Sequence, residues 1–118
     1  MPDAQTIFRT VDALDARGMA ALMAEDATMV FGNAEPLLGR EAILAGNEAF
    51  LATIKGLRHR LLNEWTVGAD TIAETDVTYT RIDGKEVTVP AVSIWRVGED
   101  GLIVSYRIFY DIAPLFAP

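Results

Sequence analysis

Two alternating segments decide the fold of this chain: Val89-Pro90-Ala91-Val92-Ser93-Ile94-Trp95-Arg96-Val97 and Leu102-Ile103-Val104-Ser105-Tyr106-Arg107-Ile108-Phe109-Tyr110-Asp111. Side chains along a β-strand point alternately to the two faces of a sheet. In both segments one face carries apolar and hydroxyl side chains and no charge. A curved sheet that turns this face towards helices encloses a deep apolar pocket with a few hydroxyl groups. The pattern therefore predicts a small-molecule site and leaves the reaction open.

The composition of the 118 residues is that of one folded domain, which we expect to span 1–118. The net charge of −7 argues against nucleic acid and an anionic membrane surface as partners, because both attract basic proteins. The absence of cysteine excludes disulfides and thiolate chemistry. No apolar run approaches the roughly 20 residues of a membrane span, and no signal-peptide stretch opens the chain. We expect a cytoplasmic protein.

Helical and alternating patterns divide the chain into two parts. Apolar residues at helical spacing predict helices over 4–16, 19–25 and 40–54, with Gly18 as the stop of the first helix. A short strand is predicted over 28–31. Alternation predicts four further strands, over 57–67, 71–82, 86–97 and 102–110. The fold class is therefore α+β, with a curved, mostly antiparallel sheet wrapped round three N-terminal helices.

The last two predicted strands are apolar on their outer face as well. This face carries Val92, Ile94, Ile103 and Phe109 by alternation. A monomer rarely exposes such a contiguous apolar patch to water. We therefore expect a homodimer in which two sheets pack through these residues.

Three segments carry a family resemblance. They are Ala13-Leu14-Asp15-Ala16-Arg17-Gly18-Met19-Ala20-Ala21-Leu22-Met23-Ala24-Glu25-Asp26-Ala27-Thr28-Met29, Gly39-Arg40-Glu41-Ala42-Ile43 and Tyr106-Arg107-Ile108-Phe109-Tyr110-Asp111. Together they resemble the nuclear transport factor 2-like (SnoaL-like) superfamily, which includes ketosteroid isomerase, limonene-epoxide hydrolase and SnoaL-like polyketide cyclases. The resemblance covers nearly the whole chain and implies a cystatin-like α+β cone with a pocket at its wide end. It implies no single function, since this fold serves enzymes, binders and assembly domains.

The resemblance assigns the known active positions of the superfamily to residues of a different kind. The general base and the oxyanion hole of the isomerases fall on Phe31, Thr10 and Ser93. The three water-activating positions of the epoxide hydrolases fall on Thr75, Val77 and Ile108, and a hydrolase-loop asparagine matches Asn33. A site without these carboxylates lacks the family's known proton-transfer groups, so we expect the known chemistries to be absent.

His59 is the only histidine of the chain, and alternation places it on the inner face. Histidine titrates near neutral pH without help from its surroundings, so His59 could act as a general acid or base. The alternative is an ordinary, partly exposed histidine near the start of a strand. We expect no metal, because zinc takes three or four ligands and no cluster of His, Asp or Glu accompanies this residue.

The remaining candidates combine polar groups with the apolar inner face. Asn47 interrupts the stripe of the third helix, so its amide is either buried beside a ligand or lies at the stripe's edge in solvent. Tyr79 and the other inward aromatic residues either fill the core or turn their hydroxyls to a ligand. With His59, Tyr79 is the second catalytic candidate. The predicted ligand-binding residues are Phe31, Asn33, Asn47, Trp65, Thr75, Val77, Ser93, Trp95, Tyr106 and Ile108.

The acidic residues of the N-terminal part have structural explanations. We expect Asp12 and Asp15 to lie on solvated helix faces or to cap helices. Arg107 and Asp111 face outward by alternation, which favours an ion pair between strands or across the dimer.

Two functions remain open at this stage. The first is an enzyme such as an isomerase, a cyclase or an epoxide hydrolase-like protein, acting on a small apolar molecule. It would use no cofactor, because no glycine-rich phosphate loop is present. The alternative is a non-catalytic ligand-binding or dimerisation domain of the same fold. An enzyme requires a titratable group inside the pocket, and this requirement separates the two.

Overall fold

The computed structural model describes residues 2–118, and its strands form one six-stranded sheet. The chain begins with two helices, continues through a strand pair and a third helix, and then forms four long strands. The elements are α1 (Ala4–Asp12), α2 (Ala16–Ala21), β1 (Met23–Phe31), β2 (Leu37–Leu38), α3 (Arg40–Leu51), β3 (Ile54–Val67), β4 (Asp70–Arg81), β5 (Glu86–Val97), β6 (Ile103–Tyr110) and the 3₁₀ helix η1 (Ala113–Phe116).

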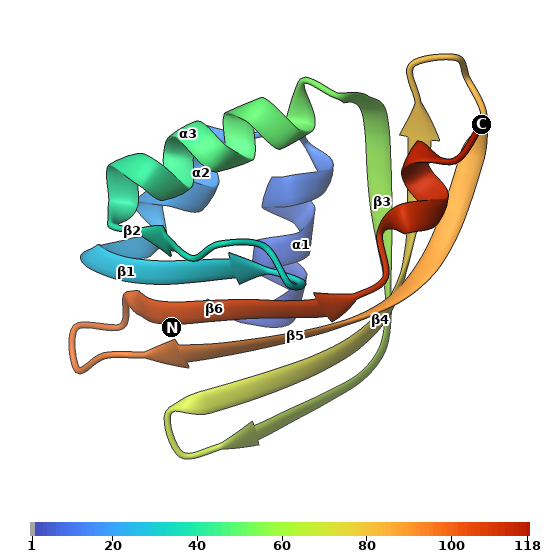
Figure 1. The fold of residues 1–118 in the computed structure, drawn as a ribbon. Helices are drawn as coiled ribbons and strands as arrows, with labels where there is room; N and C mark the ends of the chain where they lie inside the picture. The colour runs from blue at the N-terminus through green and yellow to red at the C-terminus, as the bar shows by residue number, and fades with distance from the viewer. Residues whose placement is uncertain (1) are drawn as a thin grey trace.

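The sheet is curved, and α1, α2 and α3 lie on its concave side (Figure 1). Its strand order is β2-β1-β6-β5-β4-β3. All neighbouring strands are antiparallel except β1 and β6, which run parallel. This arrangement confirms the predicted α+β class with a mostly antiparallel sheet round three helices.

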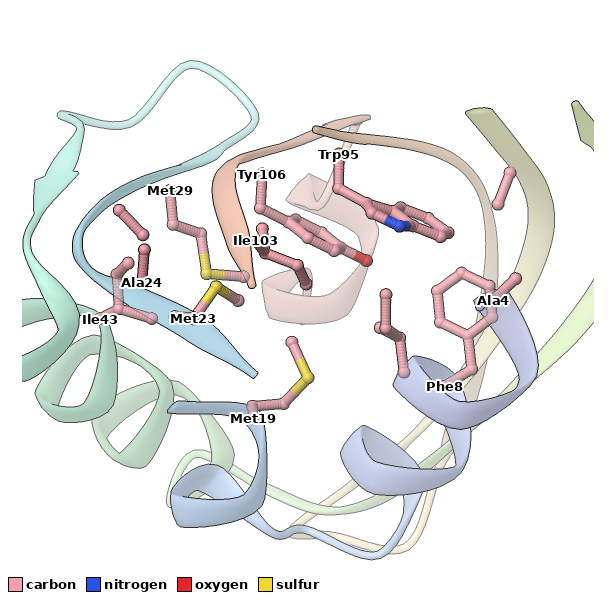
Figure 2. Packing of buried hydrophobic residues seen from close by; sticks show 13 residues of the cluster. Ala4, Phe8, Met19, Met23, Ala24, Met29, Ile43, Trp95, Ile103 and Tyr106 are labelled. Carbon is pink, nitrogen blue, oxygen red and sulfur yellow. The ribbon is translucent and has the colours of Figure 1, made fainter. Parts of the chain in front are cut away.

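The main core lies between the concave face of the sheet and the helices (Figure 2). Trp95 and Tyr106 stand side by side on neighbouring strands, and their rings stack with centroids 5.6 Å apart. Phe8 of α1, Met19 of α2 and Ile43 of α3 close the core from the helical side. Each helix therefore contributes at least one fully or almost fully buried side chain to the sheet's inner face.

The boundaries of the N-terminal elements differ from the sequence-based prediction. The first helix ends at Asp12, because Leu14 adopts a left-handed backbone (φ 58°) that turns the chain into α2. The prediction that Gly18 stops a helix is wrong. Gly18 lies inside α2, where its N–H donates to the capping carboxylate of Asp15 at 2.8 Å. The predicted second helix is wrong beyond residue 21, since β1 starts at Met23.

A β-bulge in β3 corrects the predicted orientation of Trp65. Leu61 pairs with Thr75 and Asn63 with Glu74, so Leu62 is an extra residue on β3. An extra residue reverses the alternation of every side chain beyond it. Trp65 was predicted on the inner face but lies on the outer face with 50% of its surface exposed.

A second irregularity moves Ile103 away from the predicted dimer face. The pairing of β5 with β6 shifts between Arg96 and Val97, so that Ile103 pairs with Val97 and with Met23 of β1. Ile103 is fully buried in the main core, and its predicted outer position is wrong. The reversed orientations of Trp65 and Ile103 have the same cause, a local change of strand register. The residue types in the sequence do not predict such a change.

The helices of residues 2–118 are too short or too polar to cross a membrane. The longest of them, α3, has 12 residues. A membrane-spanning helix needs about 20 apolar residues.

The contact between Gly18 and Asp15 generates a stability prediction. A Cβ atom at Gly18 would lie 2.7 Å from the Asp15 side-chain Cγ, so Gly18→Ala must displace the cap. Loss of a cap costs about 1 kcal/mol, which offsets the gain of about 1 kcal/mol that alanine normally gives inside a helix. We expect Gly18→Ala to be neutral in the wild type and stabilising by about 1 kcal/mol in an Asp15→Ala background. Urea unfolding of the four variants measures this coupling, and strict additivity would contradict it.

Candidate functional site

His59 lies on β3 opposite Val77 and faces the concave side of the sheet. Its ring Nδ1 is 2.6 Å from Oδ1 of Asp12, the last residue of α1. Its backbone N–H donates to the other carboxylate oxygen, Oδ2, at 3.0 Å. One carboxylate therefore holds both the main chain and the ring of His59.

The pairing corrects the prediction that Asp12 lies on a solvated helix face or caps a helix. The Asp12 side chain is 27% exposed and the His59 side chain 12% exposed. A carboxylate acceptor at Nδ1 favours the tautomer that carries its proton there. The lone pair of Nε2 is then free, and no hydrogen bond from residues 2–118 engages it. A signal for Asp12 was available in the sequence, because it lies four residues after the apolar Phe8 and shares its helix face.

A narrow cavity of about 40 Å³ lies beside His59, between the sheet and the three helices. Its walls come from the main core and from a second buried cluster that includes Val77 and Tyr79. Eight of the predicted site residues line it: Phe31, Asn47, His59, Val77, Tyr79, Ser93, Tyr106 and Ile108. The inner-face alternation of β4, β5 and β6 therefore leads to one enclosed space.

Four predicted ligand-binding residues do not line this cavity. Asn33 is exposed in the turn after β1, and Trp65 faces outward beyond the bulge. Thr75 is buried and donates its hydroxyl to the carbonyl of Ala91 at 2.9 Å. Trp95 is fully buried in the core. All four lie outside the wall of this cavity. Asn33 and Trp65 are exposed, the hydroxyl of Thr75 is used internally, and the Trp95 ring fills the core.

Sequence reasoning missed several apolar side chains that line the cavity. They come from the three helices, from β1 and from the start of β3. The main ones are Val11, Met19, Met29, Phe50, Leu51 and Leu57. The helical stripes contain most of them, but a stripe does not separate residues that face a cavity from residues that fill the core.

The three tyrosines of the chain give the cavity neutral hydroxyl groups. Burial raises the pKa of Tyr79 far above its usual value, and the neighbouring Tyr110 raises it further. Burial also raises the pKa of Tyr106, an effect that a hydrogen bond with Ser93 partly offsets. The pKa of Tyr110 is raised by burial as well. All three phenols are protonated at neutral pH and can donate a hydrogen bond to an oxygen of a ligand.

Asn47 is buried, which decides between the two alternatives for this residue. Its Nδ2 donates to the carbonyl of Ile43 one turn earlier at 2.9 Å and lies 3.6 Å from the sulfur of Met29. The amide is thus fixed by its own helix and by β1. Its side chain forms part of the cavity wall, where the carbonyl oxygen can accept a hydrogen bond.

Aromatic rings narrow the cavity. The Phe31 and Phe50 rings lie 6.2 Å apart, and Phe50 meets Tyr79 edge to face at 6.0 Å. About 40 Å³ holds one or two water molecules, whereas sites for drug-sized ligands are about 300–1,000 Å³. The sequence predicts a deep pocket, whereas the structure has a narrow cavity at this place.

A second hollow, an open groove of about 630 Å³, lies between α1 and β3. Charged and polar residues line most of it, among them Arg9, Asp12 and Glu64. His59 borders both the groove and the cavity and is the one residue common to their walls. No group of three or more His, Asp and Glu side chains suited to a metal ion occurs in residues 2–118.

The curved sheet, the helices on its concave side and the enclosed cavity define the class of nuclear transport factor 2-like α+β cones. The sequence profile of the SnoaL-like domain matches residues 4–106. The chain therefore belongs to the SnoaL-like domain family. No curated protein matches the sequence significantly.

Solved structures share the fold at low sequence identity. A protein of ketosteroid isomerase-like fold from Catenulispora acidiphila, in complex with trimethylamine, has a TM-score of 0.86 and 18% identity, over 100% of this chain and 95% of that chain. An NTF2-like protein of unknown function from Burkholderia pseudomallei has a TM-score of 0.83 and 18% identity, over 95% and 90%. The Δ5-3-ketosteroid isomerase from Mycobacterium sp. has a TM-score of 0.79 and 23% identity, over 93% and 91%. At these identities the likeness establishes the fold alone.

The raised pKa values of the tyrosines predict how stability depends on pH. The folded state keeps these phenols protonated where the unfolded chain ionises them, so their contribution is complete below about pH 10 and is lost as the pH rises further. We expect phenolate absorbance to appear together with loss of the circular dichroism signal, well above the titration of the urea-unfolded chain. A native protein whose tyrosines titrate near pH 10 without unfolding would contradict this.

Proposed function

We propose that this protein is a small-molecule enzyme in which His59 is the general acid/base and Asp12 orients it. The observation that carries this proposal is the 2.6 Å contact between Nδ1 of His59 and Asp12, on a ring whose Nε2 has no partner in the cavity wall. A histidine held by a carboxylate is an efficient proton acceptor near neutral pH. A titratable side chain at the cavity supports an enzyme over a binding domain.

A neutral phenol can stabilise the negative charge that forms on the ligand in the proposed reaction. In the proposed step Nε2 takes a proton from the carbon next to a ligand carbonyl, and the electron pair moves onto the carbonyl oxygen. The hydroxyl of Tyr79 donates a hydrogen bond to that oxygen and stabilises its negative charge. The imidazolium remains paired with Asp12 and returns the proton to the ligand, so the step consumes no co-reactant.

The proposed base lies at a different position from the carboxylate base of the family's isomerases. The resemblance puts the isomerase base at Phe31 on β1, where no proton acceptor exists. The His59–Asp12 pair instead joins β3 to α1. The relative from Mycobacterium is an isomerase of ketosteroids by name, which supports a carbonyl compound as ligand but not the same active residues.

The cavity's shape points to a ligand that is small, apolar and carries one oxygen function. Apolar and aromatic side chains form most of its wall, and the polar atoms come from His59, Asn47, Ser93 and the tyrosines. A ring-sized ligand requires the wall to widen. Phe50 is the side chain suited to move, because it is only partly buried and lines the cavity itself, where its ring meets Phe31 and Tyr79.

The alternative is a non-catalytic binding or dimerisation domain, and the narrowness of the cavity favours it. Under this alternative the His59–Asp12 pair only ties α1 to β3. A cytoplasmic location and the absence of nucleic acid and membrane partners stay predictions from composition.

Hydrogen–deuterium exchange of a simple ketone tests the proposed reaction. Cyclohexanone in D₂O exchanges its α-protons slowly, and we expect the protein to accelerate this exchange, followed by NMR. His59→Gln keeps the size of the side chain and removes the base, so the rate should fall about 10²- to 10⁴-fold. The matched control is Arg60→Gln, the next residue on the same strand, which is exposed and should keep the rate. Unchanged exchange in His59→Gln would refute the assignment, and ligand binding without exchange in the wild type would favour the alternative.

We also propose that the outer face of the sheet forms a homodimer. Val92, Ile94 and Phe109 of the predicted face lie there, and Trp65 and Ile72 extend the apolar surface across β3 and β4. Phe109 is 43% exposed, which is high for a large apolar side chain in a monomer. The Arg107 guanidinium lies 4.6 Å from the Phe109 ring centre, and no ion pair joins it to a carboxylate within residues 2–118.

Light scattering at micromolar concentration tests the dimer. The test variant carries a charge in the apolar patch formed by Val92, Ile94, Phe109, Trp65 and Ile72 on the outer face. Ile94→Glu puts a carboxylate opposite Arg107 on the same face, so a single subunit should tolerate it while the apolar contact between two sheets is lost. We expect the wild type to be dimeric and Ile94→Glu monomeric. Thr88→Glu, on the same face but outside the patch, should remain dimeric. A monomeric wild type, or a dimeric Ile94→Glu, would contradict the interface.

A further inference from the structure

Phe8 packs flat against the ring of His59. The ring centroids are 4.4 Å apart, and the planes are inclined by 6°. Phe8 also lies one helical turn before Asp12, so α1 presents two groups to the same histidine, a flat ring and a carboxylate. The proposed acid/base mechanism does not use Phe8.

The two contacts restrict different motions of the imidazole. A hydrogen bond at Nδ1 fixes the direction of one ring atom but allows the ring plane to tilt about that bond. A stacked neighbour removes this tilt, because rotation of the plane would bring ring atoms into collision with Phe8. Only both contacts together fix where Nε2 points.

Phe8 is itself held in place by the core. It is 5% exposed, and its ring meets the indole of Trp95 edge to face at 6.3 Å and 86°. Trp95 in turn stacks on Tyr106, with planes inclined by 5° (Figure 2). Tyr106 lines the cavity, as His59 does. A continuous row of four rings therefore connects the histidine with a phenol of the same cavity.

We propose that Phe8 is a positioning residue, which holds the imidazole plane of His59 so that Nε2 points into the cavity, in fixed relation to the hydroxyl of Tyr106. This inference rests on the proposed function for its catalytic consequence, but its geometric part stands without it. Positioning matters because misplacement of a reacting group by about 1 Å can cost about a hundredfold in rate.

The test compares Phe8→Leu, which keeps an apolar side chain but loses the flat ring, with Phe8→Tyr, which keeps the ring. Phe8 is among the residues that line the open groove. Ile7→Ala is the matched control, because Ile7 is fully buried on the same helix and lines neither hollow. It weakens the packing of α1 and leaves all four rings of the row in place.

The first readout needs no turnover. His59 is the only histidine, so the ¹⁵N NMR signals of the imidazole report this ring alone. We expect one tautomer with a hydrogen-bonded Nδ1 proton in the wild type, in Phe8→Tyr and in Ile7→Ala. In Phe8→Leu the Nδ1 proton should broaden or vanish, and the two tautomers should mix. An unchanged imidazole spectrum in Phe8→Leu would overturn the positioning role.

The second readout is the exchange of cyclohexanone, measured well below the unfolding temperature of every variant. We expect Phe8→Leu to lower kcat about tenfold to a hundredfold with little change in KM. Phe8→Tyr should restore most of the rate, and Ile7→Ala should keep it. An equal loss in Ile7→Ala would show that packing of α1 alone is responsible and would refute the proposal. If the wild type shows no exchange, the proposed function fails, and the NMR result alone decides the role of Phe8.

Discussion

The carboxylate of Asp12 links the end of α1 to β3, and both the fold and the site depend on this link. β3 is the edge strand of the sheet, so only β4 and the helices hold it. One oxygen of Asp12 accepts from the main chain of His59 and the other from its ring. The contact is partly buried, so breaking it leaves both groups with incomplete access to water. The same contact thus fixes an edge strand and selects a tautomer.

The sequence predicts the structure well where alternation is uninterrupted. In β4 and β5 the inner positions Val77, Tyr79 and Ser93 line the cavity as expected. The prediction fails beyond irregular pairing, which turned Trp65 outward and Ile103 inward. A register shift is decided by how neighbouring strands fit together, and that information is not contained in the residue types of one strand.

Two other features could not be predicted because they depend on contacts between distant segments. The partner of His59 comes from a helix that precedes it by 47 positions. The spacing of Asp12 from Phe8 indicates its helix face but not the distant residue that it contacts. The narrowness of the cavity is also a tertiary property, since it depends on how Phe50 meets Phe31 and Tyr79. The pattern of a stripe predicts which face is inside but not how much space remains there.

The parallel pairing of β1 with β6 has a consequence for how the chain folds. Met29 of β1 lies beside Tyr106 of β6, so two segments from opposite ends of the chain form adjacent strands. Contacts of such high sequence separation slow folding, because a long loop must close before they form. During synthesis on the ribosome β1 has only the two-residue strand β2 as a neighbour until β6 emerges. The antiparallel meander from β3 to β6 can form first, and the nascent β1 then joins a template that is already assembled.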